Sequence, residues 1–419
     1  MSGSKLPLLI IFVTVFIDLL GFGIVLPLLP RYGEYYLATS WQLGLLSASF
    51  SAMQFLFAPL WGRVSDRVGR RPILLLGLLG STCSYALFSY VSQLKLGEVW
   101  LGLDVLSWLF VSRIAAGIAG ATIPTAQAYI ADSTEQKDRG KGMALIGVAF
   151  GIGFVFGPLI GVFSLRSDGA PDWRPGAVAA TLSGIAFLFA LVKLPESRRP
   201  GSQAAFIPKG FRGVSKVVAR PDLMLLMATM FLTTLAFGQL ETTLSLLTKA
   251  IGMGGKSNYL VFAFLGMVLL ISQGLLVRRL LPKLGEYRMA LIGALLMTVG
   301  LPLIALAGWS QSASQLYLVL PFSVMGFAAL NPSLQASLSL RTSEHEQGEV
   351  LGFGQSASAL ARVLAPVSGN YLFGFSAMYP YLAGGVLMAI GLVCVCLTGR
   401  GAKPAGESSV TTQVETHSL

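Results

Sequence analysis

The sequence is poor in charge, histidine and cysteine. Lys, Arg, Asp and Glu together make up 12% of its 419 residues, about half of what a soluble domain carries, so a water-exposed surface cannot cover a chain of this length. There are two histidines, His345 and His417, and the three cysteines, Cys83, Cys394 and Cys396, all fall inside apolar runs. No Walker-type phosphate-binding stretch occurs. We therefore expect no metal, no cofactor, no disulfide framework and no enzyme.

What the chain has instead is apolar residues, at 54%, in runs near the roughly 20 residues that cross a bilayer as a helix. The runs are longer than the strands of a β-barrel, which take about 10 residues, and lipid offers an open strand no hydrogen-bond partner. The sequence predicts an all-α membrane protein of twelve transmembrane helices in two pseudo-symmetric six-helix bundles. The expected spans are 7–30, 42–62, 73–92, 105–131, 142–164, 175–195, 222–248, 258–280, 288–309, 314–340, 350–373 and 379–398.

A basic, Pro- and Gly-rich stretch divides the chain after the sixth span. We expect an N-terminal bundle at 1–195, a cytoplasmic linker at 196–221, a C-terminal bundle at 222–398 and a disordered tail at 399–419. The first apolar run carries Asp18 at its centre and lacks a cleavage-type end, so we interpret it as a membrane helix and not as a signal peptide.

The net charge of +11 could indicate nucleic acid, but Lys and Arg collect in the cytoplasmic loops of membrane proteins. If both termini are placed in the cytoplasm, far more Lys and Arg residues fall in the cytoplasmic segments outside the spans than in the segments on the opposite side. We therefore predict a multi-pass protein of the bacterial inner membrane that is monomeric, surrounded by lipid, and does not bind nucleic acid.

The two halves of the sequence resemble each other. "PTAQA" (124–128) in the fourth span lies over "PSLQA" (332–336) in the tenth, and the same shift places Pro158 on Pro366 and Gly161 on Gly369. A looser match pairs "GRVSDRVGRRP" (62–72) with "VRRLLPKLGEYR" (277–288). Duplicated six-helix halves are an established transporter plan in which the substrate site lies between the halves near the bilayer midplane.

Charge is concentrated in "GRVSDRVGRRP", expected as the loop between the second and third spans. Gly62 and Gly69 permit tight turning, and Pro72 suits the first turn of a helix. A loop that only sets topology would explain the arginines, but not Asp66, the glycines and the proline together. The stretch resembles the signature of the major facilitator superfamily at this loop. The resemblance implies a conformational latch made by Asp66, Arg67, Arg70 and Arg71.

Three other stretches are similar to those of the twelve-span drug:proton antiporters of this superfamily, most of all its tetracycline:proton antiporters. They are "FIDLLGFGIVLPLLP" (16–30), "SRIAAGIAGATIPTAQAYIAD" (112–132) and "GIGFVFGPLIG" (151–161). The last matches the antiporter signature through Gly153, Gly157, Pro158 and Gly161, which act either as a hinge or seal or as static packing. The second half lacks the acidic residue of the ninth span and the histidine of the eighth that tetracycline pumps carry, so tetracycline itself is not implied.

Ionisable residues inside the spans are functional candidates, because charge at bilayer depth costs roughly 2.5–3.5 kcal/mol. Asp18 can carry a proton or form a structural ion pair, and the resemblance makes Arg113 its first candidate partner. Glu241 is a second proton site, a contact for a cationic substrate, or a residue of a wetted vestibule. Arg362 lines the cavity, favours anionic substrates, pairs with Glu241, or is structural.

Polar amides within the spans can orient a ligand or join helices by hydrogen bonds. The candidates for the substrate cavity are Gln54, Gln127, Gln239, Asn331, Gln335 and Gln355. Gln127 and Gln335 are the best of them, because each follows a proline by three residues and the repeat relates them. Phenylalanines scattered along the spans are more often lipid-facing or core than part of a binding pocket.

These features predict a secondary transporter that exports a small lipophilic or drug-like molecule in exchange for protons, by alternating access. The antiporter-like fifth span favours export. A proton-coupled importer or a uniporter of a small metabolite on the same fold is the alternative. A membrane enzyme is disfavoured because no nucleophile motif or metal cluster is evident, and a receptor because the latch stretch and Asp18 are intact.

Overall fold

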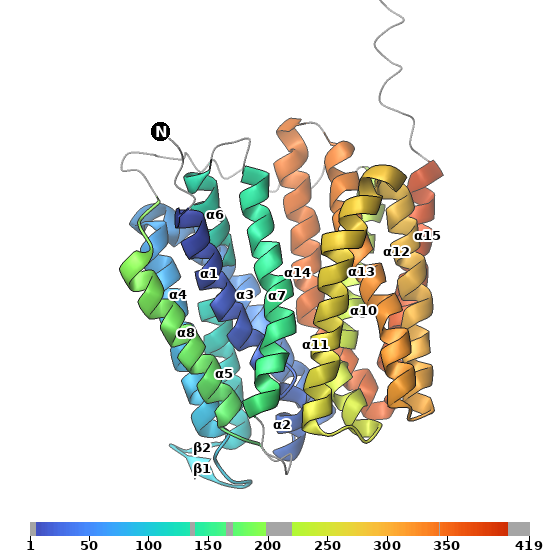
Figure 1. The fold of residues 1–419 in the computed structure, drawn as a ribbon. Coiled ribbons are helices and arrows are strands. Elements are labelled where there is room, and N and C mark those ends of the chain that lie inside the picture. Colours follow the sequence, from blue (N-terminus) through green and yellow to red (C-terminus); the bar gives the residue numbers. More distant parts are fainter. Residues whose placement is uncertain (1–5, 135–138, 165–170, 198–219, 343, 401–419) are drawn as a thin grey trace, which may run out of the picture.

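The computed structural model describes residues 6–134, 139–164, 171–197, 220–342 and 344–400. For some residues within these ranges, Asp18, 139–147 and 344–349 among them, it describes the backbone alone. The described part is almost entirely helical, and the helices run roughly parallel or antiparallel to one long axis (Figure 1).

The first half of the chain has eight described helices and one short β-hairpin. They are α1 (Leu6–Val25), α2 (Leu29–Tyr35), α3 (Ser40–Val68), α4 (Arg70–Val91), β1 (Val99–Trp100), β2 (Leu103–Asp104), α5 (Val105–Gly120), α6 (Ile123–Ser133), α7 (Arg139–Ser164) and α8 (Arg174–Lys193). The antiparallel hairpin turns through Leu101 and Gly102, both at positive φ.

The second half continues the same pattern with longer helices. They are α10 (Pro221–Ala250), α11 (Gly255–Ile271), the π-helical η1 (Ser272–Val277), α12 (Arg278–Trp309), α13 (Ala313–Leu340), α14 (Glu344–Phe375) and α15 (Tyr379–Arg400). We call α1–α8 the first half and α10–α15 the second half.

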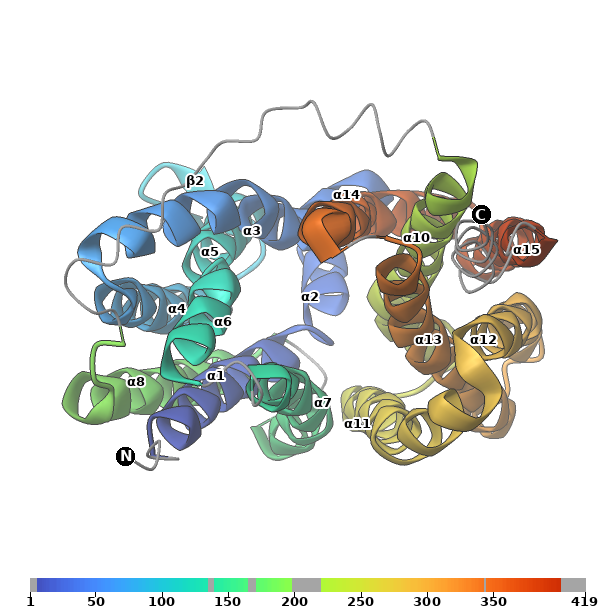
Figure 2. The ribbon, with the colours of Figure 1, turned by 90° about the horizontal axis from the view of Figure 1, so that it is seen from above.

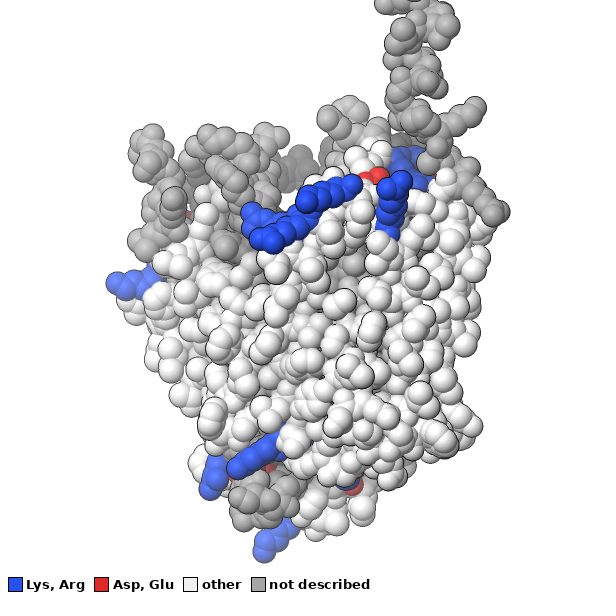
Figure 3. Space-filling view, turned by 45° about the vertical axis from the view of Figure 1, so that its right-hand side comes forward, with Lys and Arg blue, Asp and Glu red and all other residues white. Residues whose placement is uncertain are grey.

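The surface of the described part fits a membrane protein. Ten helical stretches are long and apolar enough to cross a bilayer, and one of them, Gly255–Trp309, contains α11, η1 and α12. Large apolar side chains such as Val192, Leu188 and Val393 are exposed. On the face drawn in Figure 3, Lys and Arg gather in two bands near the two ends and leave the middle uncharged. The predicted all-α membrane fold is confirmed, and these stretches accord with the twelve expected spans.

Prolines explain where two expected spans are interrupted. The run at 7–30 stops being a regular helix after Val25, because Pro27 has no N–H to donate to the carbonyl of Gly23, and α2 begins beyond it. The run at 105–131 is broken between Gly120 and Ile123, directly before Pro124, which occupies the first turn of α6.

Each half packs mainly on itself. In the first half α1 lies against α7 and α8, and α4 against α5 and α8; in the second half α10 lies against α14 and α15, and α12 against α13 and α15. Two seams join the halves, α3 with α14 and α7 with α11, and Figure 2 shows both pairs side by side. Because α3 corresponds to α11 and α7 to α14 in the repeat, the two seams are equivalent under it.

The repeat is also visible in the backbone. Gly69 separates α3 from α4 with φ 106° and ψ 159°, and Gly285 makes a sharp turn inside α12 with φ 77° and ψ 163°. Both conformations combine positive φ with extended ψ, which suits glycine because it lacks a Cβ. The weak sequence match of Gly69 with Gly285 therefore corresponds to the same local structure.

Candidate functional site

A cavity of about 420 Å³ lies between the halves and is lined by residues of both. Five phenylalanines form much of its apolar wall. In the first half Phe22 lies 5.0 Å from Phe50 and 6.0 Å from Phe154, measured between ring centroids. In the second half Phe237 stacks on Phe327 at 3.8 Å. No local sequence signal separates these rings from the lipid-facing ones, and they are the largest group that sequence reasoning missed.

Arg113 on α5 lines this cavity and is buried, with 1% of its surface exposed. Its guanidinium carbon lies 5.6 Å from the ring centroid of Tyr85 and 5.3 Å from that of Phe88, so aromatic faces supply part of its stabilisation. Its Nε and Nη2 atoms have no hydrogen-bond partner among the described residues. The cation thus keeps two donors for a further acceptor.

The predicted partner of Arg113 is Asp18, which lies in the second half of α1. Only the backbone of Asp18 is described, so its side chain lies outside the described part of the chain. The pairing of Asp18 with Arg113 stays a prediction.

The two ionisable residues predicted within the spans of the second half line the same cavity. Glu241 on α10 is half-buried and Arg362 on α14 is exposed to the cavity. Their opposite charges attract each other, but no ion pair within 4 Å joins them in the described structure. Among the described residues, neither charge is neutralised by an ion pair, so both are available to act on a molecule in the cavity.

The predicted amides divide into three groups. Gln54, Asn331 and Gln355 line the central cavity, and Gln54 also donates to the carbonyl of Gly120 at 3.1 Å. Gln239 is buried and donates to Ser368 Oγ at 2.9 Å, which joins α10 to α14.

The two amides that the sequence favoured most are not among the residues that line the central cavity. Gln127 is exposed on α6, and Gln335 lines a separate hollow beside η1. Gln127 directly follows Ala126, which does line the central cavity, and Gln335 lies one turn beyond the lining residue Asn331.

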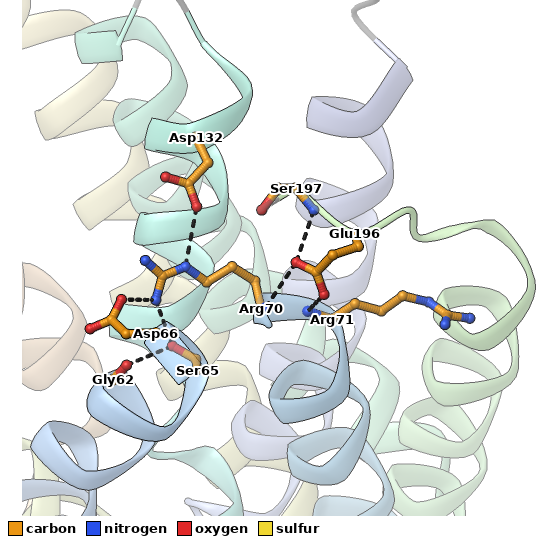
Figure 4. Close-up of polar contacts among 8 residues, drawn as sticks. All are labelled: Gly62, Ser65, Asp66, Arg70, Arg71, Asp132, Glu196 and Ser197. Atoms are coloured by element: carbon orange, nitrogen blue, oxygen red, sulfur yellow. Dashed lines mark hydrogen bonds and ion pairs between the residues drawn. The ribbon is translucent and has the colours of Figure 1, made fainter. Parts of the chain in front are cut away.

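Asp66, Ser65 and Asp132 surround the Arg70 side chain at the end of the molecule where α3 ends and α4 begins, here called the latch end (Figure 4). Arg70 Nη1 lies 2.6 Å from Asp66 Oδ1 and donates to Ser65 Oγ at 2.7 Å, and Arg70 Nε lies 3.2 Å from Asp132 Oδ2. Asp132 belongs to α6, so this one guanidinium links three helices.

Glu196 completes the latch from the other side. Its carboxylate accepts the backbone N–H groups of Arg70 at 2.9 Å and Arg71 at 3.1 Å. N–H groups in the first turn of a helix have no acceptor within the helix, and the helix dipole favours an anion at this end. A Cβ at Gly69 would clash with Glu196 Oε2, so glycine is required both for its positive φ and for the carboxylate's approach. Arg71 Nη2 donates to the carbonyl of Leu191 at 2.7 Å.

Two expectations about the latch need correction. The stretch is mostly helix and not loop, because α3 continues to Val68, and the chain turns only at Gly69. Gly62 lies inside α3, and a Cβ added there would meet nothing within 4 Å, so it makes no turn. Arg67 is exposed and makes no ion pair with the described residues.

Arg70→Ala is expected to slow transport by about tenfold while changing substrate affinity less than about twofold, because hydrogen bonds to charged groups contribute roughly 1.5–3 kcal/mol and those of Arg70 are partly exposed. The latch lies away from the cavity, so its loss should alter the balance between conformations and leave binding intact. Initial rates and equilibrium binding of the purified protein measure the two effects. Arg67→Ala is the matched control, and an equal slowing in both variants would contradict the role of Arg70.

The antiporter-signature glycines bring α7 into backbone contact with α1. A Cβ at Gly157 would lie 2.8 Å from the Cα of Gly23, and a Cβ at Gly23 would lie 2.7 Å from the carbonyl oxygen of Gly153. Pro158 is buried within α7. At Gly161 the absent side chain leaves room for the Tyr259 ring, which would clash with a Cβ there.

The end opposite the latch, here called the α2 end, joins the two halves by hydrogen bonds. The break after α1 leaves carbonyls without helical partners. Ile24 O accepts Tyr259 Oη at 2.9 Å, and Pro27 O accepts Ser245 Oγ at 2.6 Å and Asn258 Nδ2 at 3.1 Å. Pro27 therefore both interrupts the first span and supplies the acceptors that the second half uses.

Arg31 of α2 adds a further link by donating to Thr248 Oγ1 at 2.9 Å and to the carbonyl of Met253 at 3.1 Å. Lys249 pairs with Glu34 at the surface. All of these side-chain links between the halves lie at the α2 end.

Two helical halves around a central cavity, in a bundle whose helices can span a membrane, define the class of membrane carriers. The family model of the Major Facilitator Superfamily matches residues 11–366 and, in a second match, 283–415. The chain belongs to this superfamily, whose members are transporters and not enzymes.

Several known proteins are similar to the chain along most of its length. The class C tetracycline resistance protein of Escherichia coli is 32% identical over 417 residues, which is 95% of this chain and 98% of that protein. Human major facilitator superfamily domain-containing protein 10 is 31% identical and covers 85% of each chain. The expected likeness to tetracycline resistance proteins is confirmed.

Solved structures agree with the fold. The human organic anion transporter MFSD10 superposes with a TM-score of 0.68 at 27% identity, covering 94% of this chain and all of that one. A D-xylose-proton symporter superposes with a TM-score of 0.74 at 18% identity, covering 95% of this chain and 97% of that one; this second likeness concerns the fold alone.

Proposed function

We propose that the chain is a proton-coupled antiporter that exports a small lipophilic, drug-like molecule from the cytoplasm. The observation that carries the proposal is the central cavity, which combines five phenylalanines with ionisable residues from both halves. An apolar pocket with a few charged or polar groups suits an amphipathic ligand. The similarity to tetracycline resistance proteins supports export of such molecules.

Alternating access in this proposal is a rocking of residues 1–195 against residues 222–398. The bonds at the α2 end hold the halves together there, whereas the latch residues bond within their own half. With both termini in the cytoplasm, as the Lys and Arg distribution favours, the described state is closed toward the outside and ready to load from the cytoplasm. The chain then works as a monomer in the inner membrane.

The energy source in this proposal is the proton gradient. Moving one charge through 100 mV yields about 2.3 kcal/mol, and the sequence has no ATP-binding motif. Asp18 carries the proton, Arg113 responds to its charge, and Glu241 acts as a second titratable group in the cavity.

Transport in proteoliposomes tests the proposal. The purified chain is reconstituted with an internal pH dye, a pH gradient is imposed, and rhodamine 123 and fluorescein serve as aromatic probes of opposite charge. Probe flux opposite in direction to proton flux, absent in empty liposomes, is the expected result. Probe flux in the same direction as protons would indicate an importer, and flux indifferent to the gradient a uniporter; either would overturn antiport.

The bonds at the α2 end provide a separate prediction. Asn258→Ala removes a buried amide that links α11 to Pro27, and we expect it to favour opening at this end by about fivefold, since a hydrogen bond contributes roughly 1 kcal/mol. Maleimide labelling of Thr242→Cys from the α2 side, with the three native cysteines replaced by serine, measures the opening.

Lys249→Ala is the matched control for this variant. It removes an exposed ion pair with Glu34, and such pairs contribute only about 0–1 kcal/mol. The labelling rate should therefore hardly change. A larger effect from Lys249→Ala than from Asn258→Ala would contradict the assignment of the gate to the buried bonds.

A further inference from the structure

A second hollow, of about 360 Å³, lies beside η1 and is called the η1 hollow. Its polar lining consists of Gln273 on η1, Arg278 at the start of α12, and Asn331 and Gln335 on α13. Gln273 and Asn331 also line the central cavity. The hollow therefore adjoins the central cavity and lies on its latch side, where α13 runs from Asn331 to Gln335.

The polar groups of the η1 hollow are largely available to a ligand. Gln335 Nε2 lies 3.4 Å from Asn331 Oδ1, the outer limit of a hydrogen bond. Arg278 is exposed and makes no ion pair with the described residues. Three carboxamides and one guanidinium supply many N–H donors around one space, and no Asp or Glu is among the lining residues.

The backbone at this place is unusual in a way that is common at binding sites. The six residues of η1 form a π-helical turn between α11 and α12, and such turns occur often at functional sites. Gln273 is the second residue of this turn. The position where the helix departs from regular geometry is thus the position that joins the hollow to the cavity.

We propose that the η1 hollow is a loading subsite that binds an anionic, oxygen-rich group of the transported molecule before its apolar body moves into the central cavity. The inference deepens the proposed function and rests on it. It identifies the substrate class as amphipathic organic anions. Among the described residues that line either space, arginine supplies three charges, at 113, 278 and 362, and glutamate supplies one, at 241.

A transported solute fits this site better than a lipid headgroup. Gln273 and Asn331 line both the hollow and the interior cavity, so a solute bound in the hollow lies next to the cavity, whereas a lipid anchored in the bilayer would need to approach from the outer surface. Arg279, the residue after Arg278, is also exposed, but it does not line the hollow.

The adjacent arginines give a matched pair of variants. Fluorescein anisotropy with the full chain in phosphatidylcholine nanodiscs measures binding at fixed pH without a gradient. Arg278→Gln is expected to weaken fluorescein binding by about tenfold, as for the loss of one charge-assisted hydrogen bond, and Arg279→Gln less than about twofold, as for an exposed charge outside the site. Equal affinities in the two variants would overturn the subsite.

A second variant tests the sign of the charge without relying on loss alone. Gln335→Glu adds a carboxylate to the hollow. We expect it to weaken binding of the anionic fluorescein and to tighten binding of the cationic rhodamine 123, each by about threefold or more, because like charges repel and unlike charges attract at close range. No change in either probe would contradict the proposal. Melting temperatures equal to that of the parent chain show that the variants are folded.

Two further arms separate the possible failures. If added phosphatidylglycerol displaces fluorescein from the parent chain but not from Arg278→Gln, a lipid headgroup occupies the hollow and the proposal is wrong; lack of displacement supports it. If the parent chain shows no proton exchange in liposomes but fluorescein binding still depends on Arg278, the antiport proposal fails while the anion subsite stands.

Discussion

Gly157→Leu is expected to abolish transport and to lower the yield of folded protein severely. Even a Cβ at this position would lie 2.8 Å from the Cα of Gly23 and 3.0 Å from the carbonyl oxygen of Leu20. Both neighbours are backbone, so neither can move by changing a rotamer. Overpacking usually costs about 1–3 kcal/mol, and a leucine between two helix backbones must exceed that range because α1 and α7 have to separate.

The effect should be graded by side-chain size. Gly157→Ala adds the Cβ alone, so we expect reduced transport and a lower melting temperature, with folded protein still obtained. Gly352→Leu in α14 is the control, because nothing lies within 4 Å of a Cβ there. Fluorescence-detected size exclusion, melting temperature and probe flux are the measurements. Normal transport by Gly157→Leu would mean that α1 and α7 are not held in backbone contact.

The long helices could be predicted from hydropathy because membrane spans need about 20 apolar residues whatever their tertiary partners are. The expected start of the span at 73–92, for example, differs from α4 by three residues at Arg70. The interruptions at Pro27 and before Pro124 carry a signal as well, since proline cannot donate a backbone hydrogen bond. Hydropathy alone does not register that signal, which is why both runs were expected as single spans.

The site was less predictable because its contacts join residues that are distant in the chain. Asp66 and Arg70 are four residues apart, on either side of the turn at Gly69, and could be paired from sequence, whereas Asp132 and Glu196 reach Arg70 only through the fold. Both acidic residues lie near a helix end in a basic environment, which is a weak signal. Gln239 shows the converse case: a polar residue in a span that joins helices and does not line the cavity.

Asp18→Asn is expected to reduce the pH-driven accumulation of probe by about 100-fold. This factor corresponds to the roughly 2.5–3.5 kcal/mol cost of a charge at the bilayer centre. Asp18 is the thirteenth residue of the twenty in α1, so it lies roughly 18 Å along a helix that rises 1.5 Å per residue. In the proposed mechanism, a carboxylate there opposes the swing of the halves until it is protonated. Asparagine is neutral at every pH, so the swing no longer depends on protons.

The same reasoning predicts what survives. Probe binding should stay within about threefold, because the amide keeps the size and hydrogen-bonding capacity of the acid, and exchange of labelled for unlabelled probe without a gradient should continue. Asp104→Asn is the matched control, since Asp104 caps α5 at the surface by accepting the Ser107 N–H. Glu241→Gln separates the two carboxyls of the spans. If it loses pH-driven accumulation while Asp18→Asn keeps it, the proton is carried by the second half and the coupling role of Asp18 is wrong.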